Sequence, residues 1–396
     1  MATLFYRKGL DLKHVVADEL ARDYHSQFVS QIKDADHQMV SGRLTVHLAR
    51  EFGFCYGVDR AVDYAYQTRR RFPDRTVYLT GEIIHNPHVN SRLRDAGIKF
   101  LSDPDETLNA VTPDDVVILP AFGVTVAELE RLVGCGCTIV DTTCGSVLNV
   151  WKNVRQFARD GYTAIIHGKA HHEETRATTS QAVTVSGHYL VVRNRGEAAL
   201  VCDYICGRAT REAFLEHFAN ACSLDFDPDR DLQRVGLANQ TTMLMSESLE
   251  IGDMIKHAII ERHGETLLPE HYRAFETICS ATQDRQDAVR ALLDEHAFDF
   301  VVVVGGYNSS NTRNLARICA ERVTTYHIAE PTCVVSADEL RFLQPAATVP
   351  TGTDTEIVAR EWLPRSGPVS VAVTAGASTP DNIVGKVITK LVELTT

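Results

Sequence analysis

The sequence lacks any apolar run that approaches the roughly 20 residues needed to cross a bilayer. Residues 1–31 alternate charged and apolar side chains and therefore do not resemble a secretory signal. Basic residues are in deficit, because 40 Lys and Arg stand against 52 Asp and Glu for a net charge of -12. This sign argues against a nucleic-acid backbone or an anionic membrane as partner, although a local pocket can still bind an anion. We expect a cytoplasmic protein.

Cysteine is plentiful, but the spacing typical of a structural zinc site is missing. The chain has 10 cysteines, which are not expected to form disulfides in the cytoplasm. The close pairs Cys135/Cys137 and Cys202/Cys206 each lack a second pair at the spacing that zinc sites use. These four cysteines, together with Cys222, Cys319 and Cys333, are expected to be small core or surface residues.

Each of the three remaining cysteines stands where a strand pattern gives way to a helical one. Cys144 follows the β-branched run 138–143, Cys55 precedes an Ala- and Val-rich run, and Cys279 precedes the helical pattern 284–293. If three α/β units face each other, these thiols converge where helix N-termini stabilise thiolates. Such a point suits an iron–sulfur cluster, and a structural zinc ion is the alternative.

Alternating strand and helix patterns along the chain predict the α/β class with mostly parallel sheets. The strongest strand pattern is the continuous apolar run 298–304, which is typical of a central parallel strand. We expect an N-terminal extension over residues 1–50, then α/β units over 51–144, 145–278 and 279–396, the last with a C-terminal helix.

Two segments fit this organisation less well. Residues 11–33 space their apolar side chains as one amphipathic helix, expected to pack on the rest of the chain or to form a contact in a homodimer. Residues 195–231 are more polar, with aspartates alternating around Pro228. This pattern predicts an irregular insertion without chemistry.

Polar and small side chains gather after several expected strands, where open α/β sheets bind ligands. The loop 81–88 carries His85 and a second histidine, which contact an anion or, alternatively, are solvated. Segment 167–175 holds three histidines, a lysine and two carboxylates, which suit phosphate binding with proton transfer or, alternatively, a metal. Segments 305–312 and 374–381 place glycines and hydroxyls before a helix and predict an anion cradle, without the motif of a nucleoside triphosphate site.

From about residue 52 to the C-terminus, these segments resemble the 4-hydroxy-3-methylbut-2-enyl diphosphate reductases, the last enzymes of the methylerythritol phosphate route to isoprenoids. The resemblance rests on eight motifs in the order of that family: Phe54-Cys55-x-Gly57-Val58, Glu82-x-x-His85-Asn86, Asp141-x-Thr143-Cys144, His172-x-Glu174, Gln240-Thr241-Thr242, Ile278-Cys279-x-Ala281-Thr282, Asn308-Ser309-Ser310-Asn311 and Thr374-Ala375-Gly376-Ala377-Ser378. The length of the first fifty residues resembles the cyanobacterial and plastid-type branch.

The resemblance implies an iron–sulfur reductase that makes isopentenyl and dimethylallyl diphosphate by two-electron reductive dehydroxylation. Cys55, Cys144 and Cys279 would hold a 4Fe–4S cluster with one open iron, central to three α/β units in pseudo-threefold arrangement. Glu174 would supply the proton, with Thr241 in its hydrogen-bond relay, and ferredoxin would donate the electrons. The residues implied to contact the substrate are His85, His172, Thr241, Ser309, Ser310, Asn311 and Ser378. All of them except Thr241 would surround the diphosphate group.

One position departs from the family pattern. Many bacterial relatives carry a histidine in the loop where this chain has Phe122, so one diphosphate contact is missing and Lys169 or another group would compensate. The enzyme alternative is a quinolinate-synthase-like dehydratase, which also joins three α/β units around a three-cysteine cluster but binds a dicarboxylate. A non-enzymatic iron–sulfur sensor or electron carrier is the other alternative, and it leaves His172 and Glu174 without a role.

Overall fold

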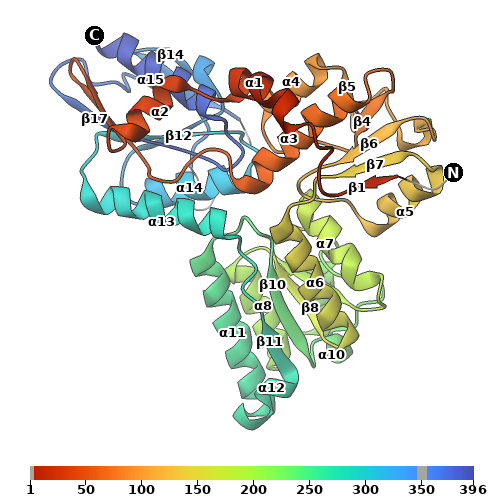
Figure 1. Ribbon diagram of the computed structural model, residues 1–396. Helices are drawn as coiled ribbons and strands as arrows, with labels where there is room; N and C mark the ends of the chain where they lie inside the picture. The colour runs from red at the N-terminus through yellow and green to blue at the C-terminus, as the bar shows by residue number, and fades with distance from the viewer. Residues whose placement is uncertain (1–3, 346–354) are drawn as a thin grey trace. The chain divides into compact units, whose positions relative to one another are not determined.

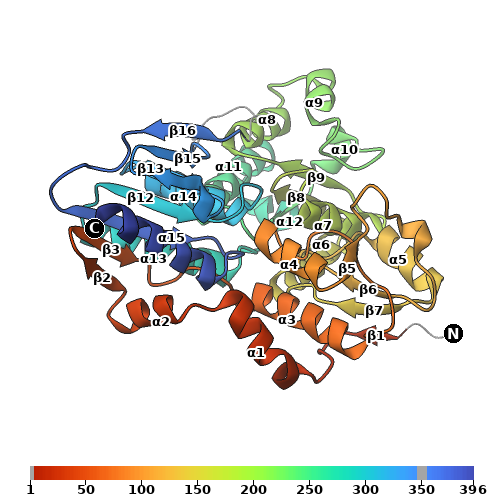
Figure 2. The ribbon, with the colours of Figure 1, turned by 90° about the horizontal axis from the view of Figure 1, so that it is seen from above.

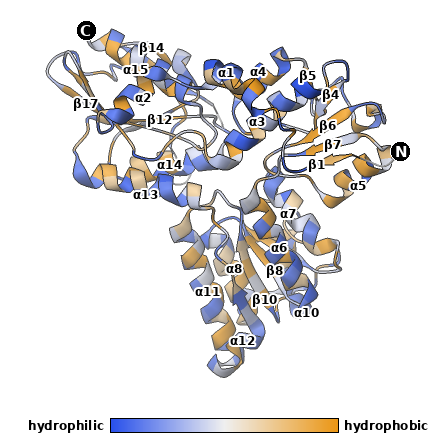
Figure 3. Cartoon of the chain, in the orientation of Figure 1, coloured by the Kyte–Doolittle hydropathy of each residue, from blue (hydrophilic) through white to orange (hydrophobic). Residues whose placement is uncertain are grey.

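The computed structural model describes residues 4–345 and 355–396. The chain forms two compact units (Figure 1). Unit 1 contains the chain up to Arg7, then Tyr78–Gly81 and Leu101–Cys279, and unit 2 contains Lys8–Val77, Glu82–Phe100 and Ser280–Thr396. Apolar residues concentrate in the strands of both units, whereas most helices carry both polar and apolar residues (Figure 3). Among the described residues, no helix has both the length and the apolar content that a bilayer crossing requires.

Unit 1 contains a four-stranded sheet with the order β11-β10-β8-β9, in which every pair is parallel. Its strands are β8 (Thr163–His167), β9 (Tyr189–Val192), β10 (Val235–Asn239) and β11 (Tyr272–Ala274). The helices around it are α6 (Gly145–Arg159), α7 (Glu173–Val183), α8 (Arg195–Ile205), α9 (Arg211–Phe218), α10 (Pro228–Asp231), α11 (Met245–His263) and α12 (Leu268–His271). Both central strands are fully buried, as their apolar sequences predict.

A second group of parallel strands in unit 1 consists of β1 (Phe5–Tyr6), β7 (Thr138–Asp141) and β6 (Val116–Leu119). The short strand β4 (Val77–Leu79) precedes them in the chain. The helix α5 (Val126–Cys135) begins at a capping box formed by Thr125 and Glu128.

Unit 2 is built on a five-stranded sheet with the order β13-β12-β17-β3-β2, parallel except for the edge strand β2. Its strands are β2 (Gln38–Ser41), β3 (Leu44–Leu48), β12 (Phe300–Val304), β13 (Thr325–Ile328) and β17 (Val369–Ala375). A small antiparallel sheet of β14 (Val334–Ser336), β15 (Glu339–Phe342) and β16 (Ile357–Arg360) lies beside β13 (Figure 2).

Helices cover both faces of the large sheet of unit 2. The helices α13 (Ser280–Glu295) and α14 (Ser310–Ala320) lie on one face, and α2 (Gln27–Asp34) and α15 (Asp381–Thr395) lie on the other (Figure 1). The remaining elements of this unit are α1 (Lys13–Tyr24), α3 (Tyr56–Arg71), α4 (Pro87–Asp95) and β5 (Ile98–Phe100). The predicted α/β class with mostly parallel sheets is therefore confirmed, whereas the predicted domain boundaries stay a prediction.

Two expectations about secondary structure are wrong, one for residues 11–33 and one for residues 195–231. The single helix expected over residues 11–33 is broken at His25, whose extended backbone ends α1, and Ser26 then caps α2 by accepting a hydrogen bond from the Val29 N–H at 3.2 Å. Residues 195–231 contain three helices, α8, α9 and α10, and are not an irregular insertion. Buried Phe214 and Phe218 anchor this segment in the core of unit 1, because the burial of two aromatic rings outweighs the polar composition around them.

Candidate functional site

The three cysteines singled out in the sequence all stand at the start of helices. Cys55 is the N-cap residue of α3, Cys144 is the N-cap residue of α6, and Cys279 directly precedes the first residue of α13. Each is partly buried and is not part of a disulfide. A strand or loop that runs into a helix at this point directs the positive end of the helix dipole toward the sulfur, which favours a thiolate.

Backbone hydrogen bonds tie each of these cysteines to a second loop of its own unit. The bonds run from Cys144 N to Ala121 O (3.0 Å), from Cys55 N to Ala377 O (3.2 Å) and from Cys279 N to Thr241 O (3.2 Å). Each acceptor lies in a loop that follows a strand: β6, β17 and β10, respectively. The position of each thiol is therefore set by the sheet as well as by its helix.

Other cysteines have a different environment. Burial raises the pKa of Cys202 and of Cys319 to about 12 in each case. Burial likewise raises the pKa of Cys206, Cys222 and Cys333. These thiols stay protonated at neutral pH and are poor metal ligands, since the thiolate is the ligand form.

In unit 1, Glu174 and Thr241 are in direct contact. Glu174 lies in the first turn of α7 with only 1% of its surface exposed, and Thr241 follows β10. The Thr241 N–H donates to Glu174 Oε1 at 2.6 Å, and the Thr241 hydroxyl donates to Oε2 at 3.0 Å. Two donors from one residue fix the plane of the buried carboxyl group.

His172 caps the helix that carries Glu174. Its Nδ1 accepts a hydrogen bond from the Glu174 N–H at 3.2 Å. The ring of Phe122 packs edge-on against this imidazole, with ring centroids 5.6 Å apart. The aromatic residue at position 122 therefore fixes the orientation of His172 by packing, where a histidine would add a polar group.

Gln240 connects the two loops of this part of unit 1. Its Oε1 accepts hydrogen bonds from Lys169 N at 3.1 Å and from Thr175 Oγ1 at 3.2 Å, while its Nε2 donates to Thr242 Oγ1 at 2.9 Å. Gln240 belongs to one of the eight motifs, but no role was predicted for it. The sequence feature that indicates such a role is its position directly after an expected strand, next to Thr241 and Thr242.

In unit 2, the loops after β12 and β17 form a cradle of small polar groups. Ser309 is the N-cap of α14, and the Ser378 hydroxyl lies 3.5 Å from the Ser309 hydroxyl and donates to His85 O at 3.2 Å. All three side chains are at least nine-tenths buried. A β-carbon at Gly306 would lie 2.7 Å from the His85 carbonyl oxygen, so only glycine permits this approach of the two loops.

Asn311 contributes an unused donor to this cradle. Its Oδ1 accepts from the Ala377 N–H at 2.9 Å, while its buried Nδ2 has no hydrogen-bond partner among the described residues. Ser310, also buried, is the first residue of α14. A buried N–H without a partner costs free energy, and its presence at a helix N-terminus is what an anion-binding site requires.

Two further residues support these loops and were not assigned a role from sequence. Asn86 caps α4 and donates through Nδ2 to Ser378 O at 2.7 Å. Arg285, 4% exposed, donates to Gly53 O at 2.8 Å and 3.2 Å and to Phe54 O at 3.1 Å. Arg285 thus holds the two residues before Cys55, and a lone arginine in a helix pattern carries no local sign of such a contact.

Apart from Cys55 and Cys144, which are anchored to Ala377 and Ala121, the predicted site residues fall into two groups. Unit 1 brings together His172, Glu174 and Thr241, with Cys279 tied to the last of them. Unit 2 brings together the cradle residues His85, Ser309, Ser310, Asn311 and Ser378.

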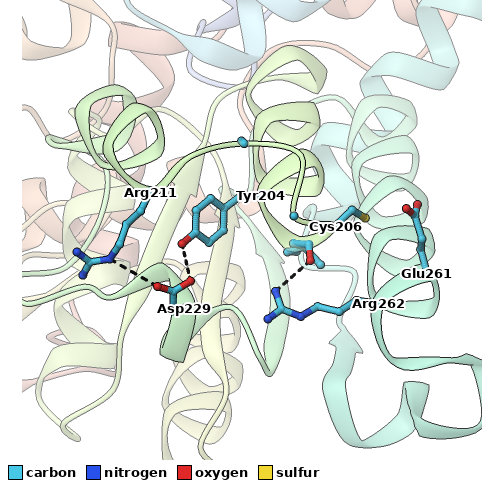
Figure 4. A pocket seen from close by; sticks show the side chains of 9 residues that line it. Tyr204, Cys206, Arg211, Asp229, Glu261 and Arg262 are labelled. Atoms are coloured by element: carbon cyan, nitrogen blue, oxygen red, sulfur yellow. Dashed lines mark hydrogen bonds and ion pairs between the residues drawn. The ribbon is translucent and has the colours of Figure 1, made fainter.

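A cavity of about 520 Å³ in unit 1 includes none of the predicted site residues (Figure 4). Its rim includes Tyr204, which donates to Asp229 at 2.7 Å, and Arg262, which donates to Ile205 O at 3.0 Å. Arg262 is near the end of α11, which begins just after Thr241, so the helix separates the two by about 25 Å. The size of this cavity is no reason to place the chemistry there.

Comparison with known proteins identifies relatives over nearly the whole chain. The model of the family described as LytB protein matches residues 46–392. A 4-hydroxy-3-methylbut-2-enyl diphosphate reductase from Synechococcus sp. (strain CC9311) is 46% identical over 393 residues, covering 98% of this chain and 96% of that protein. The protein of the same name from Thermosynechococcus vestitus is 45% identical, covering 98% and 94%.

Solved structures are similar as well. A structure of (E)-4-hydroxy-3-methyl-but-2-enyl diphosphate reductase, described as the terminal enzyme of the non-mevalonate pathway, matches with a TM-score of 0.53 and 27% identity over 88% of this chain and 99% of that one. The E-1-hydroxy-2-methyl-but-2-enyl-4-diphosphate reductase from Plasmodium falciparum matches with a TM-score of 0.61, over 88% of each chain. At its 21% identity, this second likeness supports the fold alone.

Proposed function

The chain belongs to the LytB protein family, and on this premise we propose that it is a 4-hydroxy-3-methylbut-2-enyl diphosphate reductase, an oxidoreductase of isoprenoid precursor biosynthesis. The substrate takes up two electrons and two protons, loses its hydroxyl group as water, and becomes isopentenyl or dimethylallyl diphosphate. The observation that carries the proposal is the 46% identity along 98% of the chain with a protein of that name.

We assign Cys55, Cys144 and Cys279 as the ligands of a 4Fe–4S cluster. Their chemistry fits this group, because each is a partly buried thiol outside any disulfide, at a helix start whose backbone is anchored to a strand-end loop. When bound, the cluster supplies single electrons and, at the iron without a protein ligand, Lewis acidity.

The cradle of unit 2 is suited to hold the diphosphate. Ser309 offers a hydroxyl donor, the Ser378 hydroxyl can turn from His85 O toward a ligand, and the unpartnered Nδ2 of Asn311 offers a third donor. Because Ser309 and Asn311 stand at the start of α14, the helix dipole adds a favourable field for a negative group. We assign His85, Ser310 and, from unit 1, His172 to the same ligand.

Glu174 is the proton source in this proposal. Its carboxyl group is buried and held by both donors of Thr241, so it can present a proton without competition from bulk water. The allylic carbon skeleton left after loss of the hydroxyl can accept that proton at either end, which accounts for two products from one site. Thr241 contacts the carboxyl group directly and belongs to the same hydrogen-bond relay.

Three finer assignments belong to the same proposal. Ferredoxin is the electron donor, the chain assembles as a homodimer, and it works in the cytoplasm.

Anaerobic turnover of 4-hydroxy-3-methylbut-2-enyl diphosphate tests the function. Protein reconstituted with iron and sulfide is supplied with a chemical reductant, and the products are separated. We expect both five-carbon diphosphates. A full cluster without turnover would overturn the diphosphate assignment and favour the dehydratase or sensor alternatives.

A further inference from the structure

The proposed reaction consumes two electrons, and a one-electron carrier must deliver them in two visits. If the proposed function holds, such a carrier needs a docking site from which its electrons reach the cluster. Unit 2 contains a row of aromatic rings that leads from a surface cavity to the residue before Cys55.

The row consists of Tyr66, Tyr24 and Phe54. The ring centroid of Tyr24 lies 5.9 Å from that of Tyr66, in an edge-to-face arrangement, and 5.6 Å from that of Phe54. Phe54 is bonded to Cys55, the proposed cluster ligand. Both tyrosines are buried, with 3% and 4% of their surfaces exposed. Three rings in van der Waals contact form a continuous packed medium, and electronic coupling decays less steeply through packed atoms than across a gap.

Hydrogen bonds hold the two tyrosines in place. The two hydroxyl oxygens of Tyr24 and Tyr66 lie 3.0 Å apart, and Tyr66 donates to Asp23 Oδ2 at 2.8 Å. Asn382 in turn donates to the Asp23 carbonyl at 2.6 Å. Burial raises the pKa of both tyrosines. The rings therefore stay neutral and keep their protons, so an electron passes through them without any proton transfer on the way.

The outer end of the row opens at the surface. Tyr66 lines a cavity of about 260 Å³ together with Glu19, Arg22 and Asp23 of α1 and Arg92 and Asp95 of α4. The helices α1, α3 and α4 lie side by side around it (Figures 1 and 2). Acidic and basic groups both line the cavity, which does not suit a small anion but is typical of the rim of a transient protein interface.

The three helices around the cavity carry a net charge opposite in sign to that of the whole chain. The helices α1, α3 and α4 have eight Lys and Arg against six Asp and Glu, a formal charge of +2, whereas the chain has -12. Two of the six acids, Asp23 and Asp63, are buried. Arg22 and Arg70 are 71% and 58% exposed and pair with Asp23 at 3.4 Å and Glu19 at 3.2 Å, so the net positive charge lies on the helices beside the cavity and not in its lining.

We propose that a small acidic protein with a one-electron centre docks on the surface formed by α1, α3 and α4, and that its electrons reach the cluster through Tyr66, Tyr24 and Phe54. In each visit the carrier is oxidised by one electron and the cluster is reduced by one. Two visits supply the two electrons of one turnover, and the two protons enter at the substrate.

Binding of the carrier tests the docking surface without reference to turnover. The probe is a purified acidic [2Fe–2S] ferredoxin, titrated into the reconstituted protein by calorimetry at low and high salt. Because a charge at an interface rim steers association, Arg92→Glu is expected to weaken binding about tenfold at low salt and less at high salt. Arg365→Glu is the matched control, since Arg365 lies in the same unit and is 71% exposed, and it should keep the wild-type affinity. Equal affinities for the two variants would overturn the surface.

The ring row is tested by the rate at which the cluster is reduced. In a stopped-flow experiment, Tyr24→Leu should slow reduction by ferredoxin while reduction by dithionite keeps its wild-type rate, and Tyr24→Phe, which retains the ring, should behave as wild type. An unchanged ferredoxin rate in Tyr24→Leu would overturn the route, and so would equal slowing with both reductants. If wild-type protein makes no five-carbon diphosphate with dithionite, the proposed function fails instead, and the binding result still decides the docking surface.

Discussion

Replacing Arg285 with Met should loosen the loop that carries Cys55. The guanidinium group donates to the carbonyl oxygens of Gly53, Phe54 and Ala281, the last at 2.7 Å, and the side chain is 4% exposed. Methionine fills a similar volume but donates to none of these oxygens. Each buried acceptor left without a donor costs about 1–3 kcal/mol. Ala281 O keeps the intrahelical donor that α13 provides, so the carbonyl oxygens of Gly53 and Phe54 are the two that lose one. We therefore expect a loss of about 2–6 kcal/mol in the free energy of unfolding.

Denaturant unfolding of the metal-free protein measures this loss, and iron per chain after reconstitution measures its effect on the cluster. We expect an earlier unfolding transition, faster amide exchange around Cys55, and less iron. Arg290→Met is the matched control, because Arg290 lies on the same helix but is 37% exposed and pairs with Asp287 at 3.5 Å. Such a surface pair contributes about 0–1 kcal/mol. If Arg285→Met unfolds like the control and binds full iron, the reasoning about this loop is wrong.

Three other predictions follow from the site. Glu174→Gln keeps shape but removes the transferable proton, so turnover should fall by about 100-fold or more with the cluster intact; near-normal turnover would remove Glu174 from the mechanism. Cys144→Ser should lose cluster iron, whereas Cys202→Ser, a change at a buried protonated thiol, should retain it, as measured by iron and sulfide analysis. Burial lowers the pKa of His47 and His263, so the unfolded chain binds protons below about pH 6.5 that the folded chain does not. The urea midpoint should therefore fall as the pH drops from about 7 to 5, and His263→Gln should reduce this dependence; a constant midpoint would contradict it.

Local sequence patterns were sufficient for several buried strands. The β-branched run 138–143 contains β7 (Thr138–Asp141), because a buried parallel strand needs an unbroken apolar run. The strand expected over 298–304 begins two residues later, at Phe300. Ser309 and Asn311 were selected because small polar residues between a buried strand and a helix have few purely structural uses. Both lie in the cradle of unit 2, and their role in binding stays a prediction.

Composition misled where tertiary contacts outweigh it. Residues 195–231 looked irregular because polar residues dominate, yet a few aromatic side chains bury enough surface to hold three helices on the core. The break between α1 and α2 was missed because helical spacing of apolar residues continues across His25, while one N-cap serine decides where the second helix starts.

By itself the sequence determined the fold class, the family and the identity of the candidate site residues, because strand runs, helix starts and short motifs are written in neighbouring residues. Only the tertiary structure decided that Arg285 holds the Cys55 loop, that Phe122 orients His172, and that Tyr24 connects a surface cavity to Phe54. Each of these contacts joins side chains far apart in the chain or on different elements. Their energy comes from burial and hydrogen bonding that exist only after the elements have packed, and so no local pattern records them.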